Sequence, residues 1–362
     1  MRTMDVNERY ELIREVGEEI LTEEELKGLL KKKERFIAYD GFEPSGAGIH
    51  IAQGLMRAIN VNKLIRAGAQ FKMLVADWHA MANNKLGGDL KRIQRVGEYY
   101  IELWKACGME LEHVEFVWAN DHVKNPDYWH LVMQIARRST LKRIVRCAQI
   151  MGRSESEDLQ ASQIIYPCMQ CADIFFLKAD IAQLGLDQRK VNVLARELAP
   201  QLSLQKPVVV SHHMLMGLTQ PPKGELSAAE RATALKMSKS KPDSAIFMTD
   251  SEEDVKRKLA KAYCPAGQKE DNPVLEYFRH IIFERVKAVV LRRPEKFGGD
   301  LTFASYLDLE KAFLKGEVHP ADLKACAAWH INDLIAPVRD HFERDQRARA
   351  LLAEVKTYEL TR

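Results

Sequence analysis

The sequence contains no long apolar run and only six cysteines. No stretch approaches the roughly 18 uninterrupted apolar residues that a membrane-spanning helix requires. The cysteines are scattered without the spacing of a disulfide framework, and no charged and apolar cleavable segment precedes Asn7. These absences argue against a membrane protein or a secreted protein and predict a cytoplasmic one.

The sequence also lacks a strong net charge. Its 54 basic and 51 acidic side chains leave a net charge of +3, so the total charge does not distinguish a nucleic-acid-binding protein from any other protein. The length of 362 residues, with 46% apolar and 29% charged residues, predicts a globular protein of about two domains. Any nucleic-acid contact must therefore be argued from local clusters of charge.

The pattern of cysteines and histidines does not indicate a metal site. Cys168 and Cys171 form a C-x-x-C pair, which is compatible with a redox pair or with half of a zinc site. No second pair and no matching histidine pair follows, and apolar residues surround the two thiols, so we interpret them as structural. Histidines without ligand spacing include His113, His122, His130 and His280. We predict no metal site built from protein side chains.

The first two thirds of the chain alternate between strand and helix patterns. Strands are predicted at residues 35–42, 71–76, 114–119 and 207–211, and helices at residues 49–67, 89–108 and 188–198. Asp89 is the predicted N-cap of the second helix, and Gly68 and Gly108 follow the first and the second. This alternation predicts a parallel sheet with right-handed crossovers, in which ligands bind at the carboxyl ends of the strands.

The alternation stops near residues 243–251, and only helical patterns follow. Ser251 to Asp254 reads as a capping box that opens a helix through Ala262. Further helices are predicted at residues 273–290, 305–315 and 320–349. Pro337 should kink or divide the last of these helices.

Two segments far apart in the chain contain the residue types that bind phosphate. Residues 44–54 read PSGAGIHIAQG and lie between a predicted strand and a predicted helix, where backbone N–H groups and the helix dipole would face an anion and His50 could donate to it. Residues 236–240 read KMSKS and place two lysines in a loop. Each pattern alone is common in ordinary loops. Together they resemble the two signatures of class I aminoacyl-tRNA synthetases, and the residues between them resemble the tyrosyl family in its archaeal and eukaryotic form.

The resemblance covers the chain from about Arg35 to His341 and implies a fold class. That class is α/β, with a Rossmann-like parallel-sheet catalytic domain at residues 1–247, followed by an all-α anticodon-binding domain at residues 248–362. Within the catalytic domain, the family has a connective helical insertion, here at about residues 120–165, and a KMSKS loop, here at residues 223–243.

The resemblance also implies a reaction and its partners. The enzyme would join L-tyrosine to ATP, giving tyrosyl-adenylate and pyrophosphate, and then transfer the tyrosyl group to the 3′ end of tRNA(Tyr). ATP is the substrate, Mg²⁺ accompanies it, and no carboxylate cage for the ion is visible in the sequence. The family further implies a homodimer in the cytoplasm without membrane attachment.

The expected catalytic groups follow from the charge that the reaction builds. Attack of a carboxylate on the α-phosphate of ATP places negative charge on the phosphoryl oxygens and on pyrophosphate, so cations and N–H donors are needed there. By resemblance, His50, Lys236 and Lys239 are the catalytic residues. The implied ATP-binding residues are Ser45, Gly46, Gly48, His50, Gln53, Met237, Ser238 and Ser240. The family motif His-Ile-Gly-His is HIAQ here, and Gln53 can donate a hydrogen bond but cannot be cationic.

A polar face is predicted on the segment that contains Asp173. Tyr166, Gln170 and Asp173 are spaced by four and three residues, which places them on one side of a helix. Because a carboxylate in an apolar groove is costly to bury, Asp173 needs a hydrogen-bond donor. The resemblance implies that Tyr39 and Asp173 hold the phenol of tyrosine, that Tyr166, Gln170 and Gln188 hold its ammonium group, and that His79 lines the pocket.

Contacts with tRNA are expected at two places. Arg138, Lys142 and Arg146 have the spacing of one helix face, which is either a solvated face or a stripe that follows phosphates. Their position in the insertion favours the second interpretation, and the resemblance places Arg189 near the terminal base pair. Residues expected at the anticodon are Phe297, His319 and Asp322. Without the resemblance, Phe297 would be interpreted as a core residue.

Two other functions remain open from the sequence. The tryptophanyl synthetases share the architecture, although Tyr39 with Asp173 and the complete KMSKS motif argue against them. A non-catalytic tRNA-binding paralogue would keep the fold without the reaction.

Overall fold

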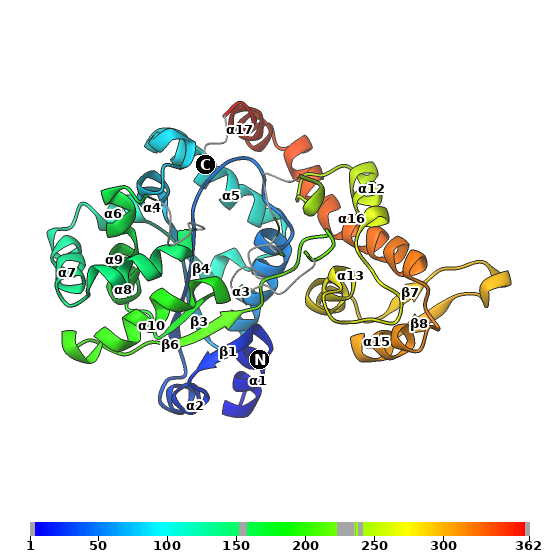
Figure 1. Ribbon diagram of the computed structural model, residues 1–362, viewed down its shortest axis with the longest axis horizontal. Coiled ribbons are helices and arrows are strands. Elements are labelled where there is room, and N and C mark those ends of the chain that lie inside the picture. Colours follow the sequence, from blue (N-terminus) through cyan, green and yellow to red (C-terminus); the bar gives the residue numbers. More distant parts are fainter. Residues whose placement is uncertain (1–3, 152–157, 223–234, 236, 238–241, 359–362) are drawn as a thin grey trace.

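The computed structural model describes residues 4–151, 158–222, 235, 237 and 242–358 (Figure 1). Its first part is built around a six-stranded sheet with the strand order β1-β6-β5-β2-β3-β4. The strands are β1 (Gly17–Leu21), β2 (Phe36–Phe42), β3 (Ala69–Val75), β4 (Val114–Trp118), β5 (Ile181–Gly185) and β6 (Val208–His212). Strands β2 to β6 pair in parallel, and β1 pairs antiparallel with β6. The predicted α/β fold with a parallel sheet is confirmed, with an antiparallel strand added at one edge.

The N-terminal segment, for which the sequence pattern made no prediction, forms this edge. Helices α1 (Val6–Val16) and α2 (Glu23–Lys32) flank β1. Asp5 begins α1 with a capping box: its carboxylate accepts from the N–H of Glu8, and the carboxylate of Glu8 accepts from the N–H of Asp5. Local hydrogen bonds therefore define where the chain first becomes helical.

Helices connect the parallel strands. They are α3 (Arg57–Arg66), α4 (Asp77–Ala82), α5 (Leu90–Ala106), α9 (Ala161–Phe176) and α10 (Arg189–Leu198). The prediction that Asp89 caps α5 is confirmed, since its carboxylate accepts from the N–H groups of Lys91 and Arg92. The helix expected from residue 49 begins later, because residues Ala52–Met56 form a π-helical turn before α3. Such turns occur frequently at functional sites.

The insertion is helical, as predicted, but its basic residues do not share one helix. It contains α6 (Ala119–His122), α7 (Pro126–Arg137) and α8 (Leu141–Cys147). Thr140 Oγ1 accepts from the N–H of Arg143 and begins α8. Arg138 therefore lies at the end of α7, whereas Lys142 and Arg146 lie on α8. The predicted continuous stripe through these three residues was wrong, because a new N-cap separates the first from the other two.

Helices dominate the chain after residue 247. They are α12 (Glu252–Lys261), α13 (Pro273–Tyr277), α14 (Phe283–Arg285), α15 (Tyr306–Leu314), α16 (Pro320–Arg344) and α17 (Gln346–Lys356). Ser251 caps α12 by accepting from the N–H of Asp254, which confirms the predicted start of this helix. Figure 1 shows α16 running back across the molecule, so that α17 comes to lie beside the sheet part near α5. An ion pair of 2.7 Å between Arg95 and Glu354 joins α5 to α17.

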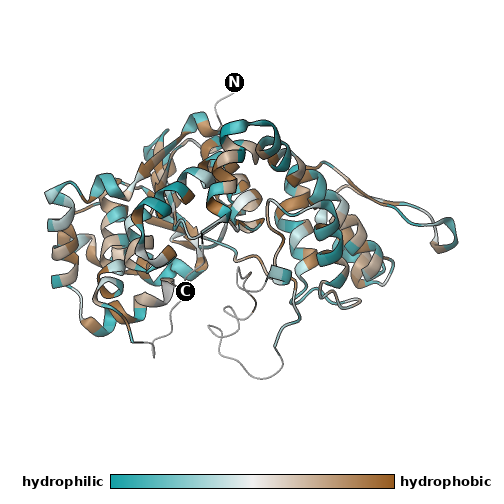
Figure 2. Cartoon of the chain, turned by 90° about the horizontal axis from the view of Figure 1, so that it is seen from above, coloured by the Kyte–Doolittle hydropathy of each residue, from teal (hydrophilic) through white to brown (hydrophobic). Residues whose placement is uncertain are grey.

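The helical part differs from the prediction at two places. The helix expected to continue to Val290 ends at Arg285, because the two adjacent valines favour a strand. Strands β7 (Val289–Leu291) and β8 (Leu301–Phe303) pair antiparallel in a hairpin that projects from the molecule and has a hydrophilic tip (Figure 2). Pro337 does not divide the last helix, since α16 continues through it. The break comes at Asp345, whose carboxylate accepts from the N–H of Ala348 and begins α17.

Two hydrophobic cores lie on opposite faces of the sheet. Because successive residues of a strand point to opposite faces, Val208 and Val210 join one core and Val209 joins the other. The first core includes α1, α3 and α5 and continues into the helical part, so the two predicted domains share apolar contacts. The second core forms with the insertion, α9 and α10. Among the residues that the structure describes, no helix is long and apolar enough to cross a bilayer.

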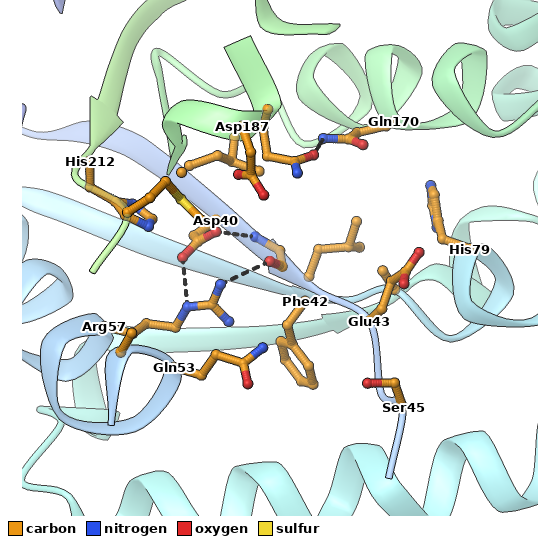
Figure 3. Close-up of a pocket in the computed structure, with 18 of the residues that line it drawn as sticks. Asp40, Phe42, Glu43, Ser45, Gln53, Arg57, His79, Gln170, Asp187 and His212 are labelled. Atoms are coloured by element: carbon orange, nitrogen blue, oxygen red, sulfur yellow. Dashed lines mark hydrogen bonds and ion pairs between the residues drawn. The ribbon is translucent and has the colours of Figure 1, made fainter. Parts of the chain in front are cut away.

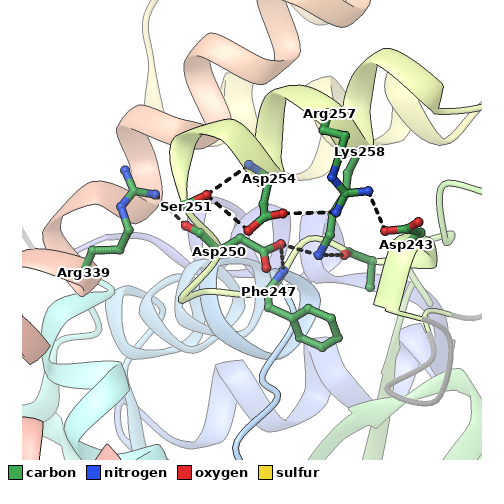
Figure 4. Close-up of polar contacts among 9 residues, drawn as sticks. Asp243, Phe247, Asp250, Ser251, Asp254, Arg257, Lys258 and Arg339 are labelled. Atoms are coloured by element: carbon green, nitrogen blue, oxygen red, sulfur yellow. Dashed lines mark hydrogen bonds and ion pairs between the residues drawn. The ribbon is translucent and has the colours of Figure 1, made fainter.

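Polar contacts join the sheet part to the helical part around residues 243–258 (Figure 4). Lys258 of α12 is buried and donates to the carbonyl oxygen of Ala245 at 3.0 Å and to the carboxylate of Asp250 at 2.6 Å. Arg339 of α16 donates to the carbonyl oxygen of Asp250 at 3.0 Å. Two helices thus hold the segment that leads from one part to the other.

Arg9 of α1 allows a test of how the N-terminal edge is held. Its buried guanidinium donates to the backbone carbonyl oxygens of Leu30, Lys33, Glu34 and Ala67. Methionine in its place would keep an apolar stem but leave these acceptors without a donor, each at a cost of about 1–3 kcal/mol when buried. We expect Arg9→Met to lower the free energy of unfolding in urea by about 3 kcal/mol or more.

The control for this experiment is Arg14→Met on the same helix. The Arg14 side chain is exposed and pairs only with Glu11 among the residues that the structure describes, so we expect an unchanged urea midpoint. Equal midpoints for the two variants would contradict the role given to Arg9.

Candidate active site

A cavity of about 490 Å³ opens at the carboxyl ends of β2 and β5 (Figure 3). Chain order reverses between these neighbouring strands, because β3 and β4 follow β2 on one side whereas β6 follows β5 on the other. Ligands of open α/β sheets bind at such a reversal. The predicted site residues that line the cavity are Tyr39, Ser45, His50, Gln53, His79, Tyr166, Gln170, Asp173, Gln188 and Met237.

Asp173 is a fully buried carboxylate in the wall of this cavity. Its Oδ1 atom accepts from the hydroxyl of Tyr128 at 3.0 Å and lies 3.1 Å from Nδ1 of His122. Its Oδ2 atom lies 2.9 Å from Nε2 of His79. The angle of that last contact is not that of a hydrogen bond, so within the described residues Oδ2 accepts no hydrogen bond. One oxygen is thus held by the protein and the other remains available to a donor in the cavity.

The surroundings of Asp173 keep it ionised. Burial alone would raise its pKa, but its interactions with His79 and His122 outweigh burial and lower the pKa to about 2. Burial likewise opposes the charged form of His79, yet Asp173 raises the pKa of His79 above its ordinary value. The pair therefore favours a carboxylate beside an imidazolium in a site with little water.

Tyr39 of β2 also lines the cavity. It is 1% exposed. Burial, together with the charge of Asp173, raises its pKa well above the ordinary value, so its hydroxyl stays protonated. A protonated hydroxyl both donates and accepts, which suits contact with another hydroxyl group.

The polar face predicted on α9 is confirmed in its geometry. Tyr166, Gln170 and Asp173 all line the cavity, and the amide of Gln170 donates to Oε1 of Gln188 at 3.0 Å. Within the described residues, Oε1 of Gln170 has no hydrogen-bond partner. Burial first, and then the nearby carboxylate of Glu43, raise the pKa of Tyr166 well above the ordinary value. Glu43 also lines the cavity and was not predicted.

The first phosphate-handling segment borders the cavity on another side. Gly46 has φ of +132°, a backbone conformation that favours glycine. Ser45, His50 and Gln53 line the cavity, whereas Gly46 and Gly48 lie in the turn and do not. His50 forms an isolated antiparallel bridge with Phe247, which connects this segment to the chain that follows the second signature.

The second signature reaches the described structure at one residue. Met237 is buried and lines the cavity. Lys236, Ser238, Lys239 and Ser240 lie outside the described residues, so their predicted roles stay predictions.

Asp40 and Arg57 form an ion pair in the cavity wall that the sequence analysis missed (Figure 3). Nε of Arg57 lies 3.0 Å from Oδ2 of Asp40, and Nη2 of Arg57 donates to the carbonyl oxygen of Gly41 at 3.3 Å. Burial raises the pKa of Asp40 to about 6, although the charge of Arg57 and the N–H of Gly41 act in the opposite direction. Aspartate is uncommon in strands, so Asp40 beside Tyr39 was the available signal.

His122 and Tyr128 were also missed, and the sequence offered no local signal for them. His122 was compared only with metal-ligand spacings, whereas in the structure it contacts a carboxylate 51 residues away. Tyr128 lies 45 residues from the same carboxylate. In the described residues, no group of three or more His, Cys, Asp and Glu side chains is arranged to hold a metal ion.

The predicted tRNA-contacting residues lie away from the cavity. Lys142 and Arg146 are exposed on α8, whereas Arg138 is only partly exposed. Arg189, at the start of α10, forms an ion pair of 2.7 Å with Glu19 of β1.

The residues predicted at the anticodon lie at the far end of the helical part. Phe297 is 61% exposed between β7 and β8, so the alternative of a core residue was wrong for it. His319 is the N-cap of α16, with Nδ1 accepting from the N–H of Ala321, and Asp322 lies in the first turn of the same helix. His319 and Asp322 therefore lie at the start of α16, whereas Phe297 lies in the turn of the hairpin.

Comparison with known proteins adds a family to this geometry. The family model of class I tRNA synthetases (W and Y) matches residues 31–336. A protein of Arabidopsis thaliana described as tyrosine–tRNA ligase 1, cytoplasmic, is 52% identical over 361 residues, which cover 99% of this chain and 90% of the relative. A tyrosine–tRNA ligase of Thermococcus sibiricus is 41% identical and covers 98% of this chain and 99% of its own length.

Solved structures agree with these relatives. The tyrosyl-tRNA synthetase of Pyrococcus horikoshii, crystallised with L-tyrosine, has a TM-score of 0.90 and 39% identity, covering 97% of this chain and all of the other, 100%. The Leishmania major tyrosyl-tRNA synthetase with tyrosinol has a TM-score of 0.89 and 47% identity, and the match covers 99% of this chain but 53% of that one. A Plasmodium falciparum tryptophanyl-tRNA synthetase, 16% identical with a TM-score of 0.69, shares the fold. The chain belongs to the family of class I tRNA synthetases (W and Y).

Proposed function

We propose that this chain is a tyrosine–tRNA ligase. It joins L-tyrosine to ATP, releasing pyrophosphate, and transfers the tyrosyl group from the adenylate to the 3′ end of tRNA(Tyr). The observation that carries this proposal is Asp173, a buried residue of the cavity wall whose Oδ2 accepts no hydrogen bond from the described residues. The high identity to relatives described as tyrosine–tRNA ligases supports the same substrate.

The phenol of tyrosine supplies the donor that Asp173 lacks. Its O–H donates to Oδ2 of Asp173, and the hydroxyl of Tyr39 contacts the same oxygen of the substrate. Phenylalanine would enter the same space but would leave a buried carboxylate oxygen without a hydrogen bond, which is costly. Tyrosyl-tRNA synthetases are the established example of discrimination by this means.

The insertion contributes to this selectivity through His122 and Tyr128. Both occupy Oδ1 of Asp173, so the carboxylate cannot rotate without breaking two contacts. Only Oδ2 is then presented to the substrate. The groups that touch Asp173 come from α4, α6 and α7, so three elements fix the position of one acceptor.

The other end of the amino acid is bound by amide and hydroxyl groups. Oε1 of Gln170 is an acceptor without a described partner, and it suits an ammonium group. Gln188 and Tyr166 border the same space, and the carboxylate of Glu43, close to Tyr166, adds a negative charge there. This arrangement orients the substrate carboxylate toward the segment around His50.

The nucleotide lies between the two signature segments. Ser45, His50 and Gln53 border the cavity on that side and provide donors for phosphate oxygens, and Met237 borders it as well. Lys236 and Lys239 would stabilise the charge that develops on pyrophosphate, as the sequence pattern predicts. Arg57 adds a cation in the wall, and its Nη1 atom has no hydrogen-bond partner among the described residues.

Mg²⁺ would arrive with ATP rather than occupy a site of its own. The described residues contain no cluster of three or more acidic, histidine or cysteine side chains suited to a metal ion. Mg²⁺ in such sites is held mainly by phosphate oxygens and water. The ion would lower the negative charge of the phosphates during attack, while His50 and Gln53 orient them.

The remaining parts of the proposal concern tRNA and assembly. Lys142 and Arg146 on α8, with Arg138 and Arg189, would contact the acceptor end through phosphates. Phe297 would stack on an anticodon base, and His319 and Asp322 would read base edges. The protein would act as a homodimer in the cytoplasm, which is the location in the name of the Arabidopsis relative.

Pyrophosphate exchange with tyrosine and tryptophan in parallel tests the choice of amino acid. Tyrosine should support exchange of labelled pyrophosphate into ATP, and tryptophan and phenylalanine should not, because neither fills both polar ends of the cavity. Exchange that depends only on tryptophan would reject the assignment. Binding of tRNA(Tyr) without any exchange would identify a non-catalytic paralogue instead.

Deleting the Tyr128 hydroxyl tests the placement of Asp173. Tyr128→Phe removes one donor to a charged acceptor, a contact worth about 1.5–3 kcal/mol. We expect the KM for tyrosine in the exchange reaction to rise about ten-fold or more, as 1.4 kcal/mol is a factor of ten. The KM for ATP should stay within about two-fold, because the hydroxyl lies at the phenol end of the cavity.

Tyr99→Phe is a matched control. It also removes a single hydroxyl from a buried tyrosine, but this hydroxyl donates to the carbonyl oxygen of Ala47, within the first signature segment. Its KM for tyrosine should therefore be unchanged. An equal rise in the KM for tyrosine in both variants would mean that Tyr128 acts through general stability and not through Asp173.

A further inference from the structure

His213 lies between two carboxylates of different parts of the molecule. It follows β6 directly, and its Nδ1 atom lies 3.0 Å from Oε2 of Glu18 in β1. Its Nε2 atom lies 3.1 Å from Oε2 of Glu276 in α13. The ring of His280 stacks on it with a centroid distance of 4.6 Å and an interplanar angle of 12°. His213 therefore bridges the edge of the sheet and the helical part.

Helix α13 also holds the chain that follows His213. Oε2 of Glu276 accepts from the N–H of Met216 at 2.9 Å. The hydroxyl of Tyr277 donates to the carbonyl oxygen of Met216 at 3.4 Å. Both ends of the short segment from His213 to Met216 are thus attached to one helix turn, with the same carboxylate oxygen at each end.

This segment is part of the active-site wall. His213, Met214 and Leu215 line the cavity that also contains His50 and Asp173. Immediately beyond the segment, the N–H of Gly217 donates at 2.7 Å to the carbonyl oxygen of Leu235, the residue before Lys236. These contacts of His213, Glu276 and Tyr277, which we call the clamp, therefore lie between the body of α13 and the chain that leads into the second signature.

We propose that His213 is a positioning residue for adenylate formation. Its imidazolium is held by Glu18 and Glu276 and keeps residues 213–216 in place as part of the cavity wall. The position of this wall relative to the sheet in turn determines the position of the nucleotide side of the cavity. The proposal rests on the function proposed above. His213 does not itself touch the reacting atoms, so its effect falls on the ATP side of the reaction and not on recognition of the phenol.

The groups that face His213 keep it charged. Burial opposes the imidazolium, but its hydrogen bond with Glu18 and its ion pairs with both Glu18 and Glu276 outweigh burial and raise the pKa of His213 to about 9. Burial lowers the pKa of the neighbouring His212 to about 4 and that of His280 to about 3, so both are neutral at pH 7. Arg279 and Lys63 are further charged groups nearby: Arg279 lowers the pKa of both Glu18 and His280, and Lys63 lowers that of His280.

A pH dependence follows from this charge. Because the folded pKa of about 9 lies above the ordinary value of 6.5, the clamp contributes its full stability below about pH 6.5 and loses it as the pH rises through about 9. The kcat/KM for ATP in pyrophosphate exchange should fall over the same pH interval. A variant without a titrating group at position 213 should lack this part of the pH profile.

The neighbouring space allows a charged replacement. His213, Glu276 and His280 also line a second cavity of about 800 Å³, which lies between β1 and the helical part. An arginine at position 213 would have room there, and its planar guanidinium can contact two carboxylates at once. Glutamine would keep a donor of similar size but no charge. The two replacements therefore separate the charge of the clamp from its shape.

The experiment compares His213→Gln, His213→Arg, Glu276→Gln and the double variant His213→Gln/Glu276→Gln by pyrophosphate exchange and thermal unfolding. His213→Gln should lower kcat/KM for ATP about ten-fold, the effect of one contact of about 1.4 kcal/mol, with the KM for tyrosine within about two-fold. His213→Arg should recover most of the loss. The double variant should be no worse than the more impaired single variant, because both remove the same contact. His113→Gln, at an exposed position, is the control and should match the wild type.

Each alternative result has one meaning. If His213→Gln keeps wild-type kinetics for ATP, or loses activity toward tyrosine and ATP equally in proportion to its unfolded fraction, His213 is not a positioning residue. If His213→Arg is as impaired as His213→Gln, or the upper limb of the pH profile persists in His213→Gln, the charge is not the cause and the proposal fails. If the wild type shows no tyrosine-dependent exchange, the proposed function itself is wrong.

Discussion

The buried carboxylate of Asp173 is the constraint on which the rest of the site depends. A buried ionised group is costly unless hydrogen bonds and opposite charges replace water, and here His122 and Tyr128 supply hydrogen bonds and His79 supplies an ion pair, from three separate helices. Sheet, insertion and α9 must therefore all be in place before the charge is stable. One oxygen is left without a hydrogen bond from the described residues. Under the proposed function, the phenol of the substrate supplies this last donor, and the selectivity of the site follows from it.

The two halves of the cavity are joined by backbone as well as by charge. The N–H of Ile51 donates to the carbonyl oxygen of Ile246, and that of Met248 to the carbonyl oxygen of Ile49, so the first signature pairs with the chain beyond the second. A Cβ atom on Gly54 would lie 2.4 Å from the sulfur of Met248, which shows how closely the two segments approach. The start of the helical part is thus in direct contact with the segment around His50 that borders the cavity.

The sequence predicted what depends on local order. Apolar periodicity located the strands around Tyr39 and the helix that begins after Asp89, and spacing placed Tyr166, Gln170 and Asp173 on one face of α9. Errors arose where one local rule competed with another. The N-cap at Thr140 divided the expected basic stripe, and α16 continues through Pro337, where a kink or a division was expected. The partners of Asp173 and of His213 were missed for a different reason. They are polar pairs between residues far apart in the chain, and neither composition nor periodicity contains that information.

Histidines and carboxylates contact each other in two different arrangements in this molecule. Two histidines surround one carboxylate at Asp173, whereas two carboxylates surround one histidine at His213. The first arrangement keeps the carboxylate charged down to about pH 2, and the second keeps the imidazolium charged up to about pH 9. Both charges are therefore constant through the neutral range. Asp40, with a pKa of about 6, differs from both, so a change of charge near neutral pH is expected at the Asp40–Arg57 pair and not at Asp173 or His213.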